Sequence, residues 1–245
     1  MGKVLQNRWV LLTGATGGIG EAIAVRFANE GANLILVDRT SQSLESLDDR
    51  IAPYGTQTIL VPLDLKNHAA IDEMALALAG RLGYLDVLIG NAGILGSLGP
   101  ITHQDAKVWQ QVLDVNLSAN WRLLRAFDPL LRLGHDPRAI FVTSEAARVP
   151  LSYWNAYGIS KAALEHLVKL YALENDRISP VKANLISPGG VRTPLRTSAF
   201  PGEDPQSVAS PEDVMDIFVY AASSLCQENG HIFHAQEPFH ERSVA

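Results

Sequence analysis

Short runs of apolar residues alternate with longer helix-like stretches along the whole chain, and this alternation limits the fold more than any other feature. The apolar runs predict strands at residues 10–13, 33–37, 59–61, 86–90, 139–143, 181–186 and 231–234. The intervening stretches predict helices at residues 21–29, 71–82, 108–133, 156–173 and 212–223. Continuous apolar strands separated by helices are typical of a parallel sheet buried on both faces. We therefore expect an α/β fold with a doubly wound parallel sheet, the Rossmann fold, in three layers.

One segment does not fit this alternation. Residues 194–211 are rich in Ser, Pro, Gly and acidic residues, and no stretch reads as a linker between two domains. We therefore expect a single dinucleotide-binding domain over residues 1–245, a length that one core can fill. A loop this long in a compact domain is usually a functional lid or a disordered segment, and we favour a substrate lid.

The charge and cysteine content exclude several classes of protein. A formal net charge of −6 argues against a nucleic acid partner, because phosphate binding needs a basic surface. The single cysteine, Cys226, rules out an internal disulfide and suits a reducing compartment, and we expect it to be a small buried residue. Residues 1–8 lack the apolar core of a signal peptide, and no apolar run approaches the ~20 residues of a membrane span. We expect a cytoplasmic protein with no membrane partner.

A glycine-rich turn, Thr13-Gly-Ala-Thr-Gly-Gly-Ile-Gly20, connects the first predicted strand to the first predicted helix. Glycines permit a tight turn and let the backbone approach a pyrophosphate closely, while the amides of the following helix face its negative charge. A glycine cluster alone is often only a turn, but the strand–loop–helix context near the N-terminus makes the signal much stronger. We predict a dinucleotide here, with contacts from Gly14, Thr16, Gly18, Ile19 and Gly20.

Two residues at the end of the second strand bear on which dinucleotide binds. Asp38 lies about twenty residues past the loop, where a carboxylate accepts the ribose hydroxyls of NAD and repels the extra phosphate of NADP. Arg39 favours NADP instead, because an arginine can pair with that phosphate. We favour NAD, with NADP as the alternative, since an unpaired carboxylate against a phosphate is costly while Arg39 can turn to solvent. The pair could also be a helix cap or a solvated surface pair.

Tyr157 and Lys161 stand four residues apart at the start of a predicted helix, so both lie on one helical face. A free phenol is a poor base at neutral pH, because its pKa is near 10. Lowering that pKa by ~3 units requires about 4 kcal/mol of differential stabilisation. A neighbouring ammonium and a cationic nicotinamide ring can favour the phenolate together. Most such pairs are ordinary helix neighbours, so this spacing alone is weak support for catalysis.

The motifs taken together resemble the short-chain dehydrogenase/reductase family in its compact form, over nearly the whole chain and in the right order. The matching positions are the glycine loop 13–20, Asp64-Leu65 after the third strand, Asn91-Ala92-Gly93 after the fourth, Asn116, Ser144, Tyr157 with Lys161, and Pro188-Gly189 with Thr193. The resemblance implies that Asp64 contacts the adenine and that residues 188–193, including Val191, form the loop on the nicotinamide side. Any one match could arise by chance, but their common order makes the assignment specific.

The resemblance also implies roles for four catalytic residues. Tyr157 would exchange a proton with the substrate oxygen as hydride moves to or from the nicotinamide. Ser144 would hydrogen-bond the same oxygen where charge develops. Lys161 would bind the nicotinamide ribose and depress the phenol pKa. Asn116 would bend its helix and hold a water that links Lys161 to solvent.

The sequence departs from the family pattern in places. Glu145 follows the catalytic serine, where it could pair with Arg148 or point into the pocket, and we favour the pair. We expect Tyr153 to line the pocket, with a plain packing role as the alternative. The last strand lacks the common Asp-Gly-Gly ending. Its histidines do not predict a metal site, because a strand period of two separates His231 from His234, and His240 lies farther on.

The leading hypothesis is an NAD(P)-dependent oxidoreductase that acts on a small-molecule alcohol/carbonyl pair. A non-catalytic NAD(P)-binding redox sensor is the first alternative, although such proteins typically lose the tyrosine or the lysine. An isomerase or dehydratase on the same fold is the second. The helices at 108–133 and 156–173 correspond to the dimerising pair of the family, so we expect a homodimer or homotetramer by analogy.

Overall fold

The computed structural model describes residues 3–237 and contains one parallel sheet of seven strands. The strand order is β3-β2-β1-β4-β5-β6-β7, so the chain winds outward in both directions from β1 and β4. The strands are β1 Trp9–Thr13, β2 Asn33–Asp38, β3 Thr58–Pro62, β4 Val87–Gly90, β5 Arg138–Val142, β6 Lys182–Ser187 and β7 Ile232–His234. Each neighbouring pair is parallel. The predicted doubly wound sheet is confirmed.

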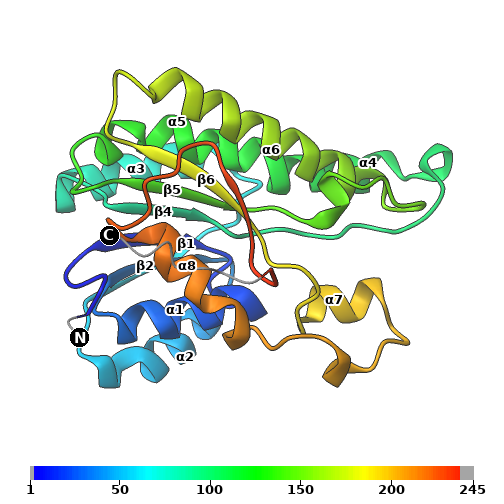
Figure 1. Cartoon of the computed structure of the whole chain (residues 1–245), viewed down its shortest axis with the longest axis horizontal. Helices are drawn as coiled ribbons and strands as arrows, with labels where there is room; N and C mark the ends of the chain where they lie inside the picture. Colours follow the sequence, from blue (N-terminus) through cyan, green and yellow to red (C-terminus); the bar gives the residue numbers. More distant parts are fainter. Residues whose placement is uncertain (1–2, 238–245) are drawn as a thin grey trace.

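Helices cover both faces of this sheet and complete three layers (Figure 1). One face carries α1 Gly18–Asn29, α2 Ser41–Ile51 and α8 Met215–Ala222. The other carries α3 His68–Leu82, α4 Ala106–Leu113, α5 Ala119–Leu131 and α6 Asn155–Asn175. Side chains of one strand alternate between the two cores: Leu12 packs toward α1, whereas Leu11 packs toward α3 and α5. This alternation explains why the strands are apolar throughout.

Three parts of the fold differ from the sequence prediction. Helix α2 was not expected, although Leu44, Leu47 and Ile51 form an apolar stripe at helical spacing. The segment 194–211 is not wholly irregular, because it contains helix α7 Pro194–Ala199 and a 3₁₀ turn at Pro205–Ser207. The helix expected over 108–133 is not continuous: a π turn at Asp114–Ser118, which contains Asn116, separates α4 from α5.

Smaller features also bear on the predictions. Cys226 is fully buried, as expected. None of the helices described in the structure has both the length and the apolar character that crossing a membrane requires. Over residues 3–237, no three His, Cys, Asp or Glu side chains gather into a possible metal site, and His240 lies outside the described residues.

Candidate functional site

A cavity of about 590 Å³ lies where the carboxyl ends of the central strands meet the helices that follow them. The segments after β1, β2, β3, β4, β5 and β6 all contribute to its wall. Residues predicted from the sequence make up much of this wall: Gly14, Thr16, Gly18, Ile19, Gly20, Asp38, Arg39, Asp64, Leu65, Asn91, Ala92, Gly93, Ser144, Tyr157, Lys161, Pro188, Gly189, Val191 and Thr193. Asn116 is the exception and does not line the cavity.

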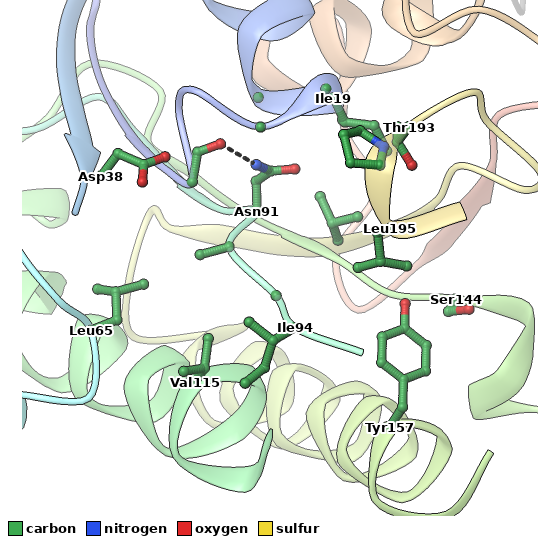
Figure 2. A pocket seen from close by; sticks show the side chains of 18 of the residues that line it. Ile19, Asp38, Leu65, Asn91, Ile94, Val115, Ser144, Tyr157, Thr193 and Leu195 are labelled. Carbon is green, nitrogen blue, oxygen red and sulfur yellow. Dashed lines mark hydrogen bonds between the residues drawn. The ribbon is translucent and has the colours of Figure 1, made fainter. Parts of the chain in front are cut away.

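The glycine turn is held against the end of β4 by side-chain hydrogen bonds. Asn91 Nδ2 donates to the carbonyls of Thr13 (3.0 Å) and Gly14 (3.1 Å). Figure 2 shows Asn91 in this part of the cavity, with a hydrogen bond from its amide group. The Thr13 hydroxyl accepts from the amides of Asn91 (3.1 Å) and Ala92 (3.2 Å). Gly14 has a φ of +63°, and a Cβ there would stand 2.8 Å from the Ala92 Cα. The turn therefore needs glycine for its own packing.

The start of α1 suits a bound anion. Its N-cap, Gly17, has no side chain that could satisfy the first amides of the helix. Gly17, Gly18, Ile19 and Gly20 all line the cavity, so the positive end of the helix faces it. A Cβ at Gly18 would stand 2.8 Å from Thr193 Cγ2, which leaves no room for a larger residue. The residues present fit the pyrophosphate of a dinucleotide.

Asp38 is fixed in the cavity wall by two backbone amides. Its Oδ2 accepts from the Thr16 amide (3.0 Å), and its Oδ1 accepts from the Arg39 amide (2.7 Å). The carboxylate therefore ties the end of β2 to the glycine turn, a role that spacing alone did not predict. Arg39 is exposed and also lines the cavity, so both a carboxylate and a guanidinium border this end.

At the opposite end of the cavity, the Tyr157 side chain rises from α6 toward Ser144 (Figure 2). Only 6% of Tyr157 is exposed, and this burial raises the pKa of its phenol, while a hydrogen bond with Ser144 opposes the rise. The Ser144 hydroxyl also accepts from the Ala146 amide (3.3 Å). Tyr157 therefore stays protonated at neutral pH in the protein alone. A depression of this pKa by Lys161 and a bound nicotinamide stays a prediction.

Lys161 lies one helical turn beyond Tyr157 and is 3% exposed. Its Nζ donates to the carbonyl of Val142 (2.8 Å) and stands 5.9 Å from the centre of the Tyr157 ring. Burial lowers the pKa of Lys161 to about 8. The amine is thus held in the cavity wall, and its pKa lies just above neutral pH.

Asn116 lies in the π turn between α4 and α5, so the predicted distortion of the helix occurs at this residue. The side chain is fully buried, and its Nδ2 donates to the Ile94 carbonyl and the Ser160 hydroxyl, both at 3.0 Å. Its Oδ1 accepts from the Ile94 amide (2.9 Å). Asn116 therefore braces the segment after Gly93 against α6, and a water bound beside it stays a prediction.

The remaining wall near Tyr157 contains residues that the sequence did not single out. Trp154 and Leu195 line the cavity, and Leu195 lies across from the Tyr157 hydroxyl in Figure 2. The expectation that Tyr153 lines the pocket is wrong: it adopts a φ of +75° and is 62% exposed. Trp154 takes its place, with its ring edge-on to Tyr157 at 5.6 Å between centroids. An aromatic pair at residues 153 and 154 was the only signal, and it did not say which ring faces inward.

Two further contacts concern residues around Ser144 and the Pro188-Gly189 loop. Glu145 pairs with Arg148 at 3.4 Å, as favoured from the sequence, and does not line the cavity. Gln236 Nε2 donates to the Gly190 carbonyl (2.6 Å). The segment after β7 therefore supports the loop that follows β6, although the Asp-Gly-Gly ending is missing.

Known proteins are similar to this chain in sequence and in architecture. The family model described as short chain dehydrogenase matches residues 8–204. The oxidoreductase YciK of Escherichia coli strain K12 is 34% identical over 237 residues, covering 95% of this chain and 93% of that protein. A short chain dehydrogenase from Pseudomonas syringae superposes with a TM-score of 0.93 at 35% identity, covering 96% of this chain and 97% of that one. A short chain dehydrogenase from Shigella flexneri 2a strain 301, complexed with NADP, gives a TM-score of 0.92 at 33% identity, covering 96% and 100%. The chain therefore belongs to the short chain dehydrogenase family of oxidoreductases.

Proposed function

We propose that this protein transfers a hydride between a nicotinamide dinucleotide and an alcohol/carbonyl substrate, with Tyr157 as the general acid and base. The observation that carries the proposal is the shared cavity: the Tyr157 and Ser144 hydroxyls stand at one end and the open start of α1 at the other. The bound dinucleotide supplies or accepts the hydride. The protein has to bind it, orient the substrate and move one proton.

The proton transfer is assigned to Tyr157. In carbonyl reduction its phenol donates a proton to the substrate oxygen, and in alcohol oxidation the phenolate takes one back. The raised pKa in the protein alone keeps the phenol protonated, which is the state that donates. Ser144 donates a hydrogen bond to the same oxygen and stabilises the charge that develops there.

Lys161 and Asn116 support this step. We assign Lys161 to bind the nicotinamide ribose, since its Nζ is buried in the cavity floor below Tyr157. Its positive charge favours the phenolate when an alcohol is oxidised. Asn116 is a positioning residue, because it touches Ile94 and Ser160 rather than the cavity.

We propose NAD as the preferred cofactor and NADP as the alternative. The Asp38 carboxylate borders the cavity and repels a ribose phosphate, which supports NAD. Its two backbone partners fix the carboxylate in place, so it cannot easily turn away. Arg39 beside it, and the NADP bound to the Shigella flexneri relative, support the alternative.

We propose that the protein is cytoplasmic and forms a homodimer or homotetramer through α5 and α6. The exposed apolar side chains Trp121, Ile159, Leu170 and Leu173 lie on these helices and favour such contacts. The two helices are neighbours on one side of the sheet (Figure 1).

Turnover of nicotinamide, followed by its absorbance with a panel of alcohols and ketones, tests the proposed activity. We expect Tyr157→Phe to lower kcat by about 10²–10⁴-fold, the usual contribution of a general acid or base, with the cofactor Kd changed less than about threefold. Dinucleotide binding without turnover on the whole panel would support the redox sensor instead. Activity that survives in Tyr157→Phe would remove the tyrosine mechanism.

A further inference from the structure

The part of the cavity around Tyr157 is apolar, and we call it the substrate end, defined by Ser144, Tyr157, Trp154, Leu195 and Ala199. Leu95, Tyr157, Trp154, Leu195 and Ala199 also belong to one small hydrophobic cluster, apart from the two cores that flank the sheet. Apolar walls with few polar groups select apolar substituents, and the polar groups fix the reacting atom. Here Ser144 and Tyr157 supply those groups.

Charged side chains are unevenly distributed around the cavity. Within residues 3–237, those that line it are Asp38, Arg39, Asp64, Lys66, Lys161 and Arg196. Asp38 ends β2, and Arg39, Asp64 and Lys66 follow β2 or β3. Figure 2 shows Asp38 and Leu65 on the side of the cavity away from Ser144 and Tyr157, and Lys161 is buried. Arg196, on α7, is the remaining cation and the one that could meet a charged substrate.

Arg196 is already engaged on two sides. Its Nε donates to Glu203 Oε2 (2.7 Å) and its NH2 group to Glu203 Oε1 (2.5 Å), a bidentate pair. Its Cζ also lies 3.9 Å from the centre of the Phe200 ring. The side chains of Arg196 and Glu203 are only 28% and 24% exposed, and pairing with Arg196 lowers the pKa of Glu203. The carboxylate therefore stays ionised and keeps the guanidinium occupied.

This ion pair is continuous with the aromatic wall of the substrate end. The Phe200 ring lies 5.6 Å from Trp154, and Trp154 lies 5.6 Å from Tyr157. An anionic substrate could therefore pair with Arg196 only by breaking this half-buried ion pair. A carboxylate or phosphate in the substrate would have no available cation among the described residues of this end, and a buried unpaired charge is costly.

Resting on the proposed oxidoreductase function, we propose that the substrate is an uncharged ketone or secondary alcohol with an aromatic or alicyclic substituent, and that the Arg196–Glu203 pair excludes anionic substrates. Trp154 and Leu195 pack against the ring of the substrate, while Ser144 and Tyr157 hydrogen-bond its oxygen. Glu203 acts as a specificity-determining residue because it neutralises the guanidinium that would otherwise attract a carboxylate.

Two nearly isosteric ketones, 4-acetylbenzamide and 4-acetylbenzoate, test the proposal with the full chain and saturating cofactor. For the wild-type protein we expect kcat/KM to favour the neutral amide by at least about tenfold, the cost of an unpaired charge. In Glu203→Gln we expect kcat/KM for the benzoate to rise by about tenfold and that for the amide to change less than about threefold. Equal use of both ketones by the wild type would overturn the proposal.

Two control variants distinguish an effect of the unpaired Arg196 charge from an effect of loosening the segment 194–211. Arg196→Gln combined with Glu203→Gln removes both charges, and we expect the benzoate to gain nothing. Glu212→Gln makes the same charge change at an exposed residue that does not line the cavity. We expect the ratio of kcat/KM for the amide to that for the benzoate to stay unchanged in this variant. A gain for the benzoate in either control would contradict the role of Arg196.

Binding of both compounds to the cofactor-loaded protein, measured by calorimetry, distinguishes this proposal from the function on which it rests. Selective binding of the amide without turnover would uphold the neutral ligand class and refute hydride transfer. Turnover with equal binding of the amide and the benzoate would uphold hydride transfer and refute the neutral ligand class. Failure of the amide to bind would overturn the ligand class.

Discussion

The hydroxyl of Thr143 donates a 2.8 Å hydrogen bond to Oε1 of Glu165, in the buried space between β5 and α6. It is the last of three contacts that α6 makes with consecutive residues at the end of β5. Tyr157 hydrogen-bonds Ser144, Lys161 Nζ donates to the Val142 carbonyl, and Glu165 accepts from Thr143. Because Tyr157, Lys161 and Glu165 are spaced by four residues, one face of α6 fixes the strand end that carries Ser144.

Thr143→Val should destabilise the protein by about 2–3 kcal/mol, because the buried Glu165 carboxylate loses a donor. Thr143→Ser keeps the hydroxyl and is the matched control, with a loss of about 1 kcal/mol for one methyl group. Urea unfolding followed by circular dichroism measures both. A valine variant as stable as the serine variant would show that this hydrogen bond adds nothing.

Asp38→Ala should raise kcat/KM for NADP by about tenfold or more relative to NAD, since it removes the carboxylate that repels the ribose phosphate. Adding Arg39→Ala to that variant should reverse most of the gain, because the guanidinium is then no longer present to pair with the phosphate. Steady-state kinetics with both dinucleotides check these ratios. A wild-type protein that already prefers NADP would show that Arg39, rather than Asp38, decides the choice.

The buried Lys161 should make stability depend on pH. Its pKa is lowered from 10.5 to about 8 by burial, so between these values the unfolded chain binds more protons than the folded protein. The free energy of unfolding contributed by this group therefore rises with pH across that window, by up to about 3 kcal/mol, and is flat below about pH 8. The difference in unfolding free energy between wild type and Lys161→Met, measured at pH 7 and pH 10, isolates the contribution of Lys161 from that of other titrating groups. An identical difference at both pH values would contradict the lowered pKa.

Gly18→Ala should weaken dinucleotide binding and cost about 1–3 kcal/mol of stability, because the new Cβ would stand 2.8 Å from Thr193 Cγ2. Thr193→Ser removes that methyl group and keeps the hydroxyl that caps α7 by accepting from the Arg196 amide. The double variant should therefore recover most of the loss. Thermal unfolding and dinucleotide titration of the two variants measure it. If stability and dinucleotide binding did not recover in the double variant, a clash with the Thr193 methyl group would not be the reason for glycine at position 18.

Much of the candidate site follows from the sequence because its motifs are tied to strand ends. In a parallel sheet the carboxyl ends of all strands lie at one edge, so short motifs after β1, β4, β5 and β6 must converge. Each motif needs only its own strand to be placed correctly. Helix α2 escaped prediction because its apolar stripe of Leu44, Leu47 and Ile51 is sparse among polar residues, although the spacing was present.

Local periodicity and chain order were enough to predict the doubly wound sheet, the glycine turn and many of the residues that border the cavity. The sequence did not predict that Trp154 rather than Tyr153 faces Tyr157, that Glu165 accepts a hydrogen bond from Thr143, or that Glu203 pairs with Arg196. These outcomes depend on backbone angles at the start of α6 and on contacts between separate elements. Periodicity places a residue on a face, but the packing of neighbouring elements chooses its partner.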